Sequence, residues 1–292
     1  MSFTERPCPI CEGRDTSRRY RLRAKKVFWC RRCRLFFIDP FPDEKTLRAS
    51  YEGTASEFQK NYFESFQDLR SKSFTKGIGV LKRRNRHGRL LDVGTGLGFF
   101  LAQARREGWE VEGLELSDEV AQYARRTLQL PVHVGTLESA SLQTGRYDVM
   151  TLWDVLEHFP NPKRSLLRIR ELLAPGGMVV IRTPVCDSLI PWLLRVLYGA
   201  SFGRIRFGFE KLFKEHLFHF SEKGLRQLIT DCGFRIVASY REDYTDSHAL
   251  SQKEWARNFF IRFGALTAIL LSHLLKRQDE VVVYAESTRS SI

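Results

Sequence analysis

A glycine-rich loop between an apolar strand and an amphipathic helix most constrains the fold of this chain. The stretch RLLDV at 89–93 is short, apolar and bounded, which is typical of a strand, and it runs directly into the loop GTGLG at 94–98. FFLAQARREG, at 99–108, then has helical spacing and ends on a glycine. A second strand, EVEGLEL, and a helix that Ser117 can cap follow. This β-α-β-α order predicts an α/β fold built on a parallel sheet.

The loop also distinguishes between two kinds of ligand. A dinucleotide fingerprint needs glycine at its first, third and sixth positions, but the sixth position counted from Gly94 is Phe99. Asp92 closes the strand just before the loop, where a carboxylate would repel a pyrophosphate and suit a ligand that carries an ammonium and a sulfonium. Glu115 ends the next strand, where an acidic residue can accept hydrogen bonds from both ribose hydroxyls. These features favour S-adenosylmethionine over a dinucleotide.

Four successive motifs, LLDVGTGLGFF, VEGLELS, YDVMTLWDVLEHFPNP and LLAPGGMVVIRTP, resemble those of class I S-adenosylmethionine-dependent methyltransferases. The resemblance covers roughly residues 85–290. It implies a Rossmann-like α/β fold whose mostly parallel, seven-stranded sheet has the order 3-2-1-4-5-7-6, with the seventh strand antiparallel. It also implies an enzyme that transfers a methyl group.

Two further stretches narrow the resemblance. FWCRRCRLFFIDPFPDEKTLRASYEG and EHLFHFSEKGLRQLITDCGF are similar to a bacterial branch with a zinc ribbon, related to ubiquinone-type O-methyltransferases and to sugar or polysaccharide methyltransferases. By this resemblance, the methionine part of the cofactor would contact Asp92, Gly94, Gly96 and Gly98. The ribose would contact Glu115, with Leu116 beside it, and the adenine would contact Thr136 and Leu137. Trp153 and Asp154 would form the floor of the pocket.

Two Cys-x-x-Cys knuckles stand near the start of the chain. They consist of Cys8 with Cys11 and Cys30 with Cys33. Each knuckle presents two thiolates from one tight turn, so together they predict a tetrahedral zinc site. Four sulfur ligands leave no position for water, and we therefore expect the zinc to be structural. MSFTERPCPI lacks the apolar core of a secretory signal, which favours a reducing cytoplasm. Cys186 and Cys232 are then expected to be buried thiols.

The pattern divides the chain into a zinc ribbon at 1–45, a helical linker or cap at 46–85, and an S-adenosylmethionine-binding domain at 86–292. The last domain has insertions near 186–220, after the fifth strand, and near 245–278, between the sixth and seventh strands. The second insertion includes an apolar helix at 258–275. Arg262 and His273 interrupt it, so it is too short to span a membrane and fits a lid, a core helix or a helix on the membrane surface.

The net charge of +13 gathers in RDTSRRYRLRAKK, between the knuckles, and in LKRRNRHGR, before residue 90. Clustered positive charge can meet a phosphate backbone or the anionic inner face of a membrane, or it can be a solvated face without a dedicated partner. Nucleic acid is therefore a less favoured partner, and peripheral membrane contact stays open.

Three histidines are candidates for the base that removes a proton from a methyl acceptor. His158 lies in LEHF just after the fourth strand, and His216 and His219 lie in EHLFHF before the helix that follows the fifth strand. His216 has Glu215 beside it and is the first choice, while Glu157 could orient or ligate. Structural histidines bonded to backbone carbonyls are the alternative.

Three functions therefore stay open. The first is a methyltransferase that acts on a small molecule, a sugar or a lipid-linked glycan at oxygen. The second is an RNA methyltransferase that grips nucleic acid with its basic ribbon, although WDVL lacks the Asn/Asp-Pro-Pro-aromatic tetrad usual for amino methylation of nucleic acids. The third is a non-catalytic module that only binds the cofactor.

Overall fold

The structure is a computed structural model of the 292-residue chain. It describes residues 6–22, 25–41, 57–84, 86–201, 204, 213, 216–242, 271–275 and 277–288, and for 57–69 it describes the backbone alone.

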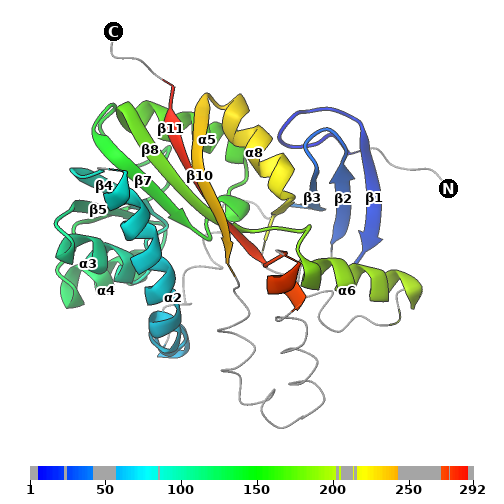
Figure 1. The fold of residues 1–292 in the computed structure, drawn as a ribbon, viewed down its shortest axis with the longest axis horizontal. Coiled ribbons are helices and arrows are strands. Elements are labelled where there is room, and N and C mark those ends of the chain that lie inside the picture. Colours follow the sequence, from blue (N-terminus) through cyan, green and yellow to red (C-terminus); the bar gives the residue numbers. More distant parts are fainter. Residues whose placement is uncertain are drawn as a thin grey trace.

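A seven-stranded sheet forms the centre of the molecule (Figure 1). Its strands are β4 (Arg89–Val93), β5 (Glu110–Glu115), β6 (Val132–Val134), β7 (Tyr147–Trp153), β8 (Leu173–Pro184), β10 (Phe234–Glu242) and β11 (Glu280–Ser287). They lie in the order β10-β11-β8-β7-β4-β5-β6, and only β11 runs antiparallel to its two neighbours. Counted along the chain from the other edge, this is the predicted order 3-2-1-4-5-7-6, which is confirmed.

Helices cover both faces of this sheet. One face carries α2 (Glu57–Arg83), α3 (Phe99–Arg106) and α4 (Asp118–Thr127), and the other carries α5 (Pro162–Leu172) and α8 (Glu222–Asp231). The helix starts follow from local chemistry, because the side chains of Ser117, Asn161 and Ser221 each accept a hydrogen bond from a backbone N–H in the first turn of α4, α5 and α8. Each face thus has its own hydrophobic core.

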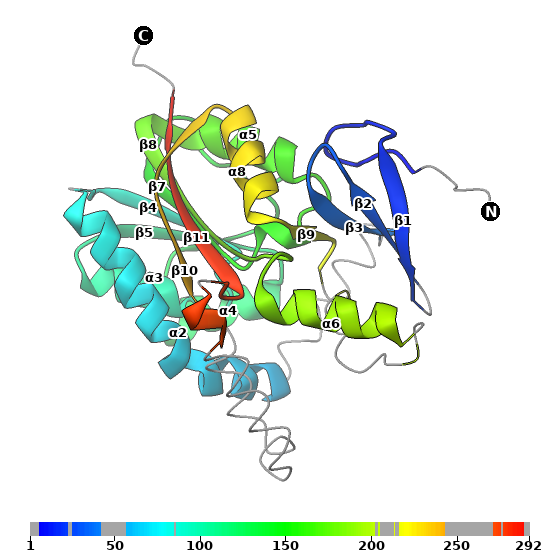
Figure 2. The same ribbon diagram turned by 45° about the vertical axis from the view of Figure 1, so that its right-hand side comes forward.

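The N-terminal ribbon consists of β1 (Thr16–Arg21), β2 (Lys26–Cys30) and β3 (Leu35–Asp39). Its sheet has a fourth strand, β9 (Phe218–Phe220), which pairs antiparallel with β3 (Figure 2). The sequence predicts a ribbon confined to 1–45, whereas the structure completes the ribbon sheet from the insertion near 186–220. An apolar edge strand such as LFFID needs a partner, and the insertion supplies it.

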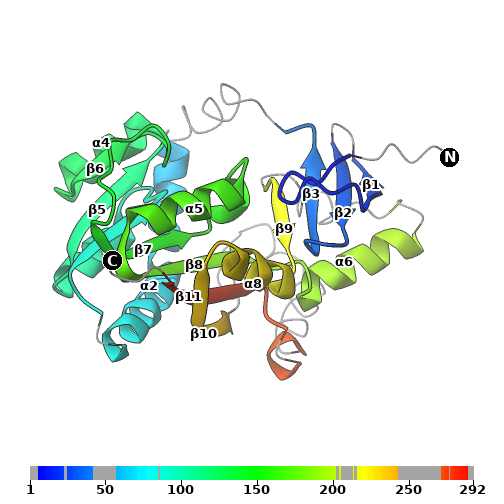
Figure 3. The same ribbon diagram turned by 90° about the horizontal axis from the view of Figure 1, so that it is seen from above.

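The ribbon is tied closely to the large domain at β9 (Figure 3). Ser221 donates both its backbone N–H and its hydroxyl to the carbonyl of Arg34, at 3.1 Å and 2.6 Å. A Cβ atom on Gly224, in the first turn of α8, would lie 2.2 Å from the carbonyl oxygen of Cys33, so only glycine allows this approach. The second knuckle of the ribbon therefore rests directly on α8.

The remaining predicted segments are described in part. The linker is helical from residue 57, and 42–56 lie outside the described residues. In the first insertion, α6 (Leu189–Ala200) follows β8. Of the apolar segment at 258–275, only 271–275 are described. Among the described residues, no helix combines the length and the apolar character that crossing a membrane requires.

Candidate active site

The three glycines of the loop after β4 all have a positive φ, between 56° and 84°. A Cβ atom on Gly94 would lie 2.6 Å from Val155, and one on Gly98 would lie 2.6 Å from Leu130. Around Gly96, by contrast, a Cβ atom would have no neighbour within 4 Å. Two glycines thus allow tight packing of the loop, while the middle one faces open space in which a ligand can approach the backbone.

The carboxylate of Glu115 is held by three backbone N–H groups. One oxygen accepts from Gly96 at 2.9 Å, and the other accepts from Leu116 at 2.8 Å and from Ser117 at 3.0 Å. Burial raises the pKa of this carboxyl, and the backbone N–H groups oppose that shift. A carboxylate offers about four acceptor positions, so the side chain is fixed in place and can still accept from a hydroxyl of a ligand.

Asp92 is buried at the end of β4, and its Oδ1 accepts a hydrogen bond of 2.6 Å from the hydroxyl of Thr151. Burial raises the pKa of Asp92 to about 7. A cation beside this carboxyl would favour its ionised form, which fits the expected ammonium group of the ligand.

The loop after β6 carries the residues expected at the adenine. Gly135 donates its N–H to the carbonyl of Glu115 at 2.9 Å, which fixes this loop against the end of β5. The backbone N–H groups of Thr136 and Ser139 each donate a hydrogen bond to the side-chain hydroxyl of the other residue. Leu137 is buried in the core. The loop therefore lies beside Glu115, the residue predicted to contact the ribose.

The ring of Trp153, a residue predicted for the floor of the pocket, packs into the core on the face of the sheet that carries α2 and α3. It packs against Phe74 and Phe100, with ring centroids 5.2 Å and 5.1 Å apart, and a Cβ atom on Gly77 would lie 2.7 Å from it. The ring thus belongs to the core beneath α2. Asp154, the next residue, has φ of 58° and directs its carboxylate toward Arg70 and Arg182, at 3.4 Å and 3.3 Å.

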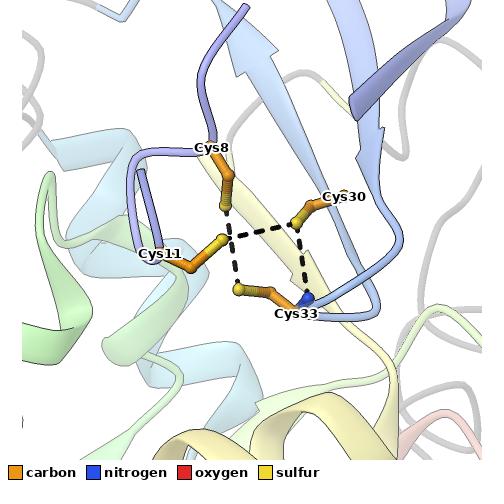
Figure 4. A group of neighbouring side chains, drawn as sticks. All are labelled: Cys8, Cys11, Cys30 and Cys33. Atoms are coloured by element: carbon orange, nitrogen blue, oxygen red, sulfur yellow. Dashed lines mark hydrogen bonds between the residues drawn. The ribbon is translucent and has the colours of Figure 1, made fainter. Parts of the chain in front are cut away.

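The four knuckle cysteines converge as predicted (Figure 4). Their Sγ atoms all lie within 4.8 Å of one another, and Cys8 to Cys33 and Cys11 to Cys30 are each 3.8 Å apart. A tetrahedron of zinc–sulfur bonds of about 2.3 Å puts the sulfurs about 3.8 Å apart. Hydrogen bonds from neighbouring thiols hold the pKa of Cys30 well below its usual value. The residues therefore fit a structural zinc ion.

The three candidate histidines form one cluster. The rings of His158 and His216 are 4.9 Å apart between centroids, and those of His216 and His219 are 5.5 Å apart. His158 ends the short 3-10 helix η1 (Leu156–His158), while His219 lies in β9 opposite Phe36. His216 precedes β9, so the alternation of a strand does not separate the two rings. Burial lowers the pKa of His216 to about 4 and that of His219 well below its usual value.

Glu157 lies in η1 next to His158, and its ligand atom is close to those of His158 and His216. Its side chain is buried, and one oxygen accepts a hydrogen bond of 2.8 Å from the hydroxyl of Thr183 on β8. Burial, reinforced by the negative charge of Asp154, raises the pKa of Glu157 to about 8. Glu215, which the sequence places beside His216, lies outside the described residues.

A buried charge network beside this cluster was not predicted. Arg182, on β8, contacts the carboxylates of Asp154, Glu242 and Glu280. The signal was present in the sequence, because Arg182 interrupts the apolar strand MVVIRTP and Glu280 begins EVVVYAE. A charge in a buried strand indicates a partner in the fold, but it does not say which.

The comparison with protein families matches a model described as "Methyltransferase domain" to residues 58–239. The chain belongs to this methyltransferase family. Its sheet is that of the class I S-adenosylmethionine-dependent methyltransferases. The open space at Gly96 and the fixed carboxylate of Glu115 fit this cofactor.

The chain is 37% identical over 119 residues to a ubiquinone biosynthesis O-methyltransferase of Serratia proteamaculans. The aligned region covers 39% of this chain and 48% of that protein. The chain thus spans about half the length of the curated relatives it matches. Among solved structures, phosphoethanolamine N-methyltransferase 2 of Haemonchus contortus, in complex with S-adenosylmethionine, has a TM-score of 0.56 at 15% identity, over 87% of this chain and 63% of that one. Geranyl diphosphate C-methyltransferase of Streptomyces coelicolor has a TM-score of 0.55 at 17% identity, over 80% and 86%. At these identities the likeness shows the fold alone.

Proposed function

We propose that this protein transfers a methyl group from S-adenosylmethionine to an oxygen atom of a small-molecule, sugar or lipid-linked glycan acceptor, and that the histidine cluster activates this oxygen. One observation carries the proposal: the rings of His158 in η1, His216 just before β9 and His219 in β9 form one cluster. Val155, just before η1, contacts the position of Gly94. The curated relatives named as O-methyltransferases support oxygen as the acceptor atom.

The reaction asks two things of the chain. The cofactor supplies an electrophilic methyl group on a sulfonium. The acceptor hydroxyl must lose its proton as its oxygen bonds to the methyl carbon, while the carbon–sulfur bond breaks and S-adenosylhomocysteine leaves. The glycine loop and Glu115 fix the donor side, and the histidine cluster provides polar groups on the acceptor side. The proposal therefore assigns activation of the hydroxyl to the cluster.

The test is the replacement of each cluster histidine by alanine. We expect His216→Ala to lower turnover about a hundredfold or more on the true acceptor, with nearly unchanged affinity for S-adenosylmethionine by calorimetry. His133→Ala is a matched control, because His133 lies on β6 and pairs with Glu112 instead. Normal turnover in all three variants His158→Ala, His216→Ala and His219→Ala would exclude activation by the cluster.

A specific observation favours a lipid-linked acceptor and contact with a membrane. Large apolar side chains are exposed on α6 and on the segment at 271–275: Trp192, Leu193, Val196, Leu197, Leu271, Leu274 and Leu275. The segment leading to β11 is tied to α6, because Leu189 donates its N–H to the carbonyl of Arg277. Exposed apolar helix faces of this kind support binding at a membrane surface.

Sedimentation with anionic phospholipid vesicles tests this second candidate. We expect the protein to sediment with the vesicles, and the double variant Trp192→Ser, Leu197→Ser to bind at least tenfold more weakly. The control is Gln122→Ser, which changes a side chain on the surface of α4, outside the apolar face of α6. Equal vesicle binding by the double variant would exclude the α6 face.

The RNA alternative has less support. In the basic stretch before residue 90, Arg84 donates to the carbonyl of Val237 at 2.6 Å, and Arg86 pairs with Glu286 at 2.7 Å. These guanidinium groups are engaged within the chain, which weakens the case for a phosphate-binding surface there. A non-catalytic module would have no use for the converging histidines.

A further inference from the structure

We propose that Glu157, His158 and His216 form a second metal site, which binds one divalent first-row transition ion such as Zn²⁺, Mn²⁺ or Fe²⁺. The site is separate from the four-cysteine cluster of the ribbon. Its existence does not depend on the acceptor, whereas its use in activating a hydroxyl rests on the proposed methyl transfer to oxygen.

The three ligand atoms already lie close to one another. One ligand atom from each of the three residues lies within 4.8 Å of the other two. Ligand atoms bonded to one ion at about 2.0–2.2 Å are about 3–3.5 Å apart, so small side-chain rotations would complete the site. The backbone brings the two segments together, because Leu217 donates its N–H to the carbonyl of Glu157 at 3.0 Å.

Glu157 provides an independent indication of a ligand. Its carboxyl is fully buried, and Oε2 accepts from the hydroxyl of Thr183 at 2.8 Å. Its Oε1 is also buried but has no hydrogen-bond partner among the described residues. A buried carboxylate oxygen without a partner is costly, and a cation bound to it would remove that cost. Thr183 would then orient the ligand from behind, as outer-shell groups commonly do.

The surrounding charge also favours a cation. Asp154, Glu242 and Glu280 contact Arg182, and Asp154 also contacts Arg70. Asp154 is also close enough to Glu157 to raise the pKa of its carboxyl. Together with Glu157, these residues provide four carboxyl groups and two guanidinium groups. If all six are ionised, two negative charges stay unbalanced, which a divalent ion would neutralise.

The donor set selects the class of metal. Two imidazole nitrogens and one carboxylate oxygen suit zinc, iron and manganese, whereas magnesium and calcium prefer oxygen ligands alone. Three protein ligands leave positions open, in contrast to the four sulfurs of the ribbon. Val155, just before η1, lies against the position of Gly94, so the chain segment that leads into the site starts at the glycine loop. An acceptor oxygen could occupy one of the open positions. The ion would lower the pKa of that hydroxyl, whose proton would pass to water.

Cobalt(II) is the probe for this site, because it binds similar ligands to zinc and absorbs visible light. We expect the 292-residue chain, with zinc in its ribbon, to bind one further equivalent of Co²⁺ by calorimetry. Weak visible bands should appear without the strong near-ultraviolet absorption of cobalt–thiolate bonds. Glu157→Gln, which keeps the side-chain shape, and His216→Ala should each weaken this binding at least tenfold. The control His133→Ala should bind like the wild type, because His133 with Glu112 forms a histidine–carboxylate pair elsewhere.

Each outcome has one meaning. If the wild type binds no further Co²⁺, or if Glu157→Gln and His216→Ala bind it as tightly as the wild type, the metal site is wrong. The proposed function could still stand, because turnover is measured separately. If Co²⁺ binds as expected but no oxygen acceptor is methylated, the site stands and the proposed function fails.

Discussion

The two clusters of ligand-type side chains in this protein are built in opposite ways. The ribbon cluster takes its four sulfurs from two local turns, each complete within four residues, and it is closed. The cluster of Glu157, His158 and His216 is assembled from η1 and the entry to β9, and it has three ligands of mixed type. Under the proposals above, the difference teaches that local knuckles can serve stability, whereas the side chains brought together by the fold would serve chemistry. The two regions meet, because β9 pairs with β3.

Loss of a ribbon cysteine should have the largest effect. We expect Cys30→Ser to remove the zinc and to lower the free energy of unfolding by at least about 5 kcal/mol, because structural zinc contributes roughly 10 kcal/mol or more at neutral pH. Metal analysis and urea denaturation measure both changes. Cys232→Ala removes a buried thiol outside the cluster and should keep one zinc. An equally stable, zinc-free Cys30→Ser would show that the closed cluster is not structural.

Breaking the charge network beside the second cluster should have the next largest effect. Arg182→Met leaves the carboxylates of Asp154, Glu242 and Glu280 without their shared partner, which should cost about 3–5 kcal/mol. Burial already raises the pKa of Glu280, and a raised acid pKa means that stability is lost as the pH rises. The cost should therefore grow between pH 5 and pH 8.

The surface pair of Arg235 and Glu286 gives the matched control for this experiment, since Arg235 is 72% exposed. Arg235→Met should change the free energy of unfolding by less than about 1 kcal/mol. Equal effects of Arg182→Met and Arg235→Met on the free energy of unfolding in urea would mean that the buried network contributes no more to stability than the surface pair.

A change at the residue beside the cofactor loop should affect cofactor binding without affecting metal binding at either cluster. Glu115→Ala should weaken S-adenosylmethionine binding by roughly 1.5 to 3 kcal/mol, the typical contribution of charge-assisted hydrogen bonds. Zinc content and Co²⁺ binding should stay as in the wild type. Calorimetry measures the affinity, and Glu119→Ala, on the exposed start of α4, is the control. Tight binding of a dinucleotide in place of S-adenosylmethionine would overturn the assignment of the loop.

The smallest effect should come from the hydroxyl that orients Glu157. Thr183→Val removes a buried hydrogen bond of 2.8 Å and should lower the free energy of unfolding by about 1–2 kcal/mol. It should also weaken Co²⁺ binding about tenfold, as loss of an outer-shell partner does. Thr230→Val, on an exposed part of α8, should change neither quantity. If Thr183→Val lowers stability without affecting Co²⁺, then Thr183 does not position a metal ligand.

Much of the fold could be predicted because its signals are local. Strand and helix periods, the caps at Ser117 and the glycine loop each act within a few residues, and the family resemblance supplied the order of the strands. Trp153 shows what such local signals leave undetermined. Its place at the end of β7 was predicted, but the packing of its ring against Phe74 of α2 was not. Which face a side chain takes depends on the register of the strand and on what covers the sheet.

The sequence alone determined the zinc knuckles, the glycine loop and Glu115, because the spacing of these residues encodes their geometry directly. Only the tertiary structure decided that β9 completes the ribbon sheet, and that His216 thereby comes beside His158 and Glu157. The physical reason is that pairing between distant strands follows from burial of apolar edges across the whole fold. A short sequence such as FHF fits many partners, and the completed packing selects one.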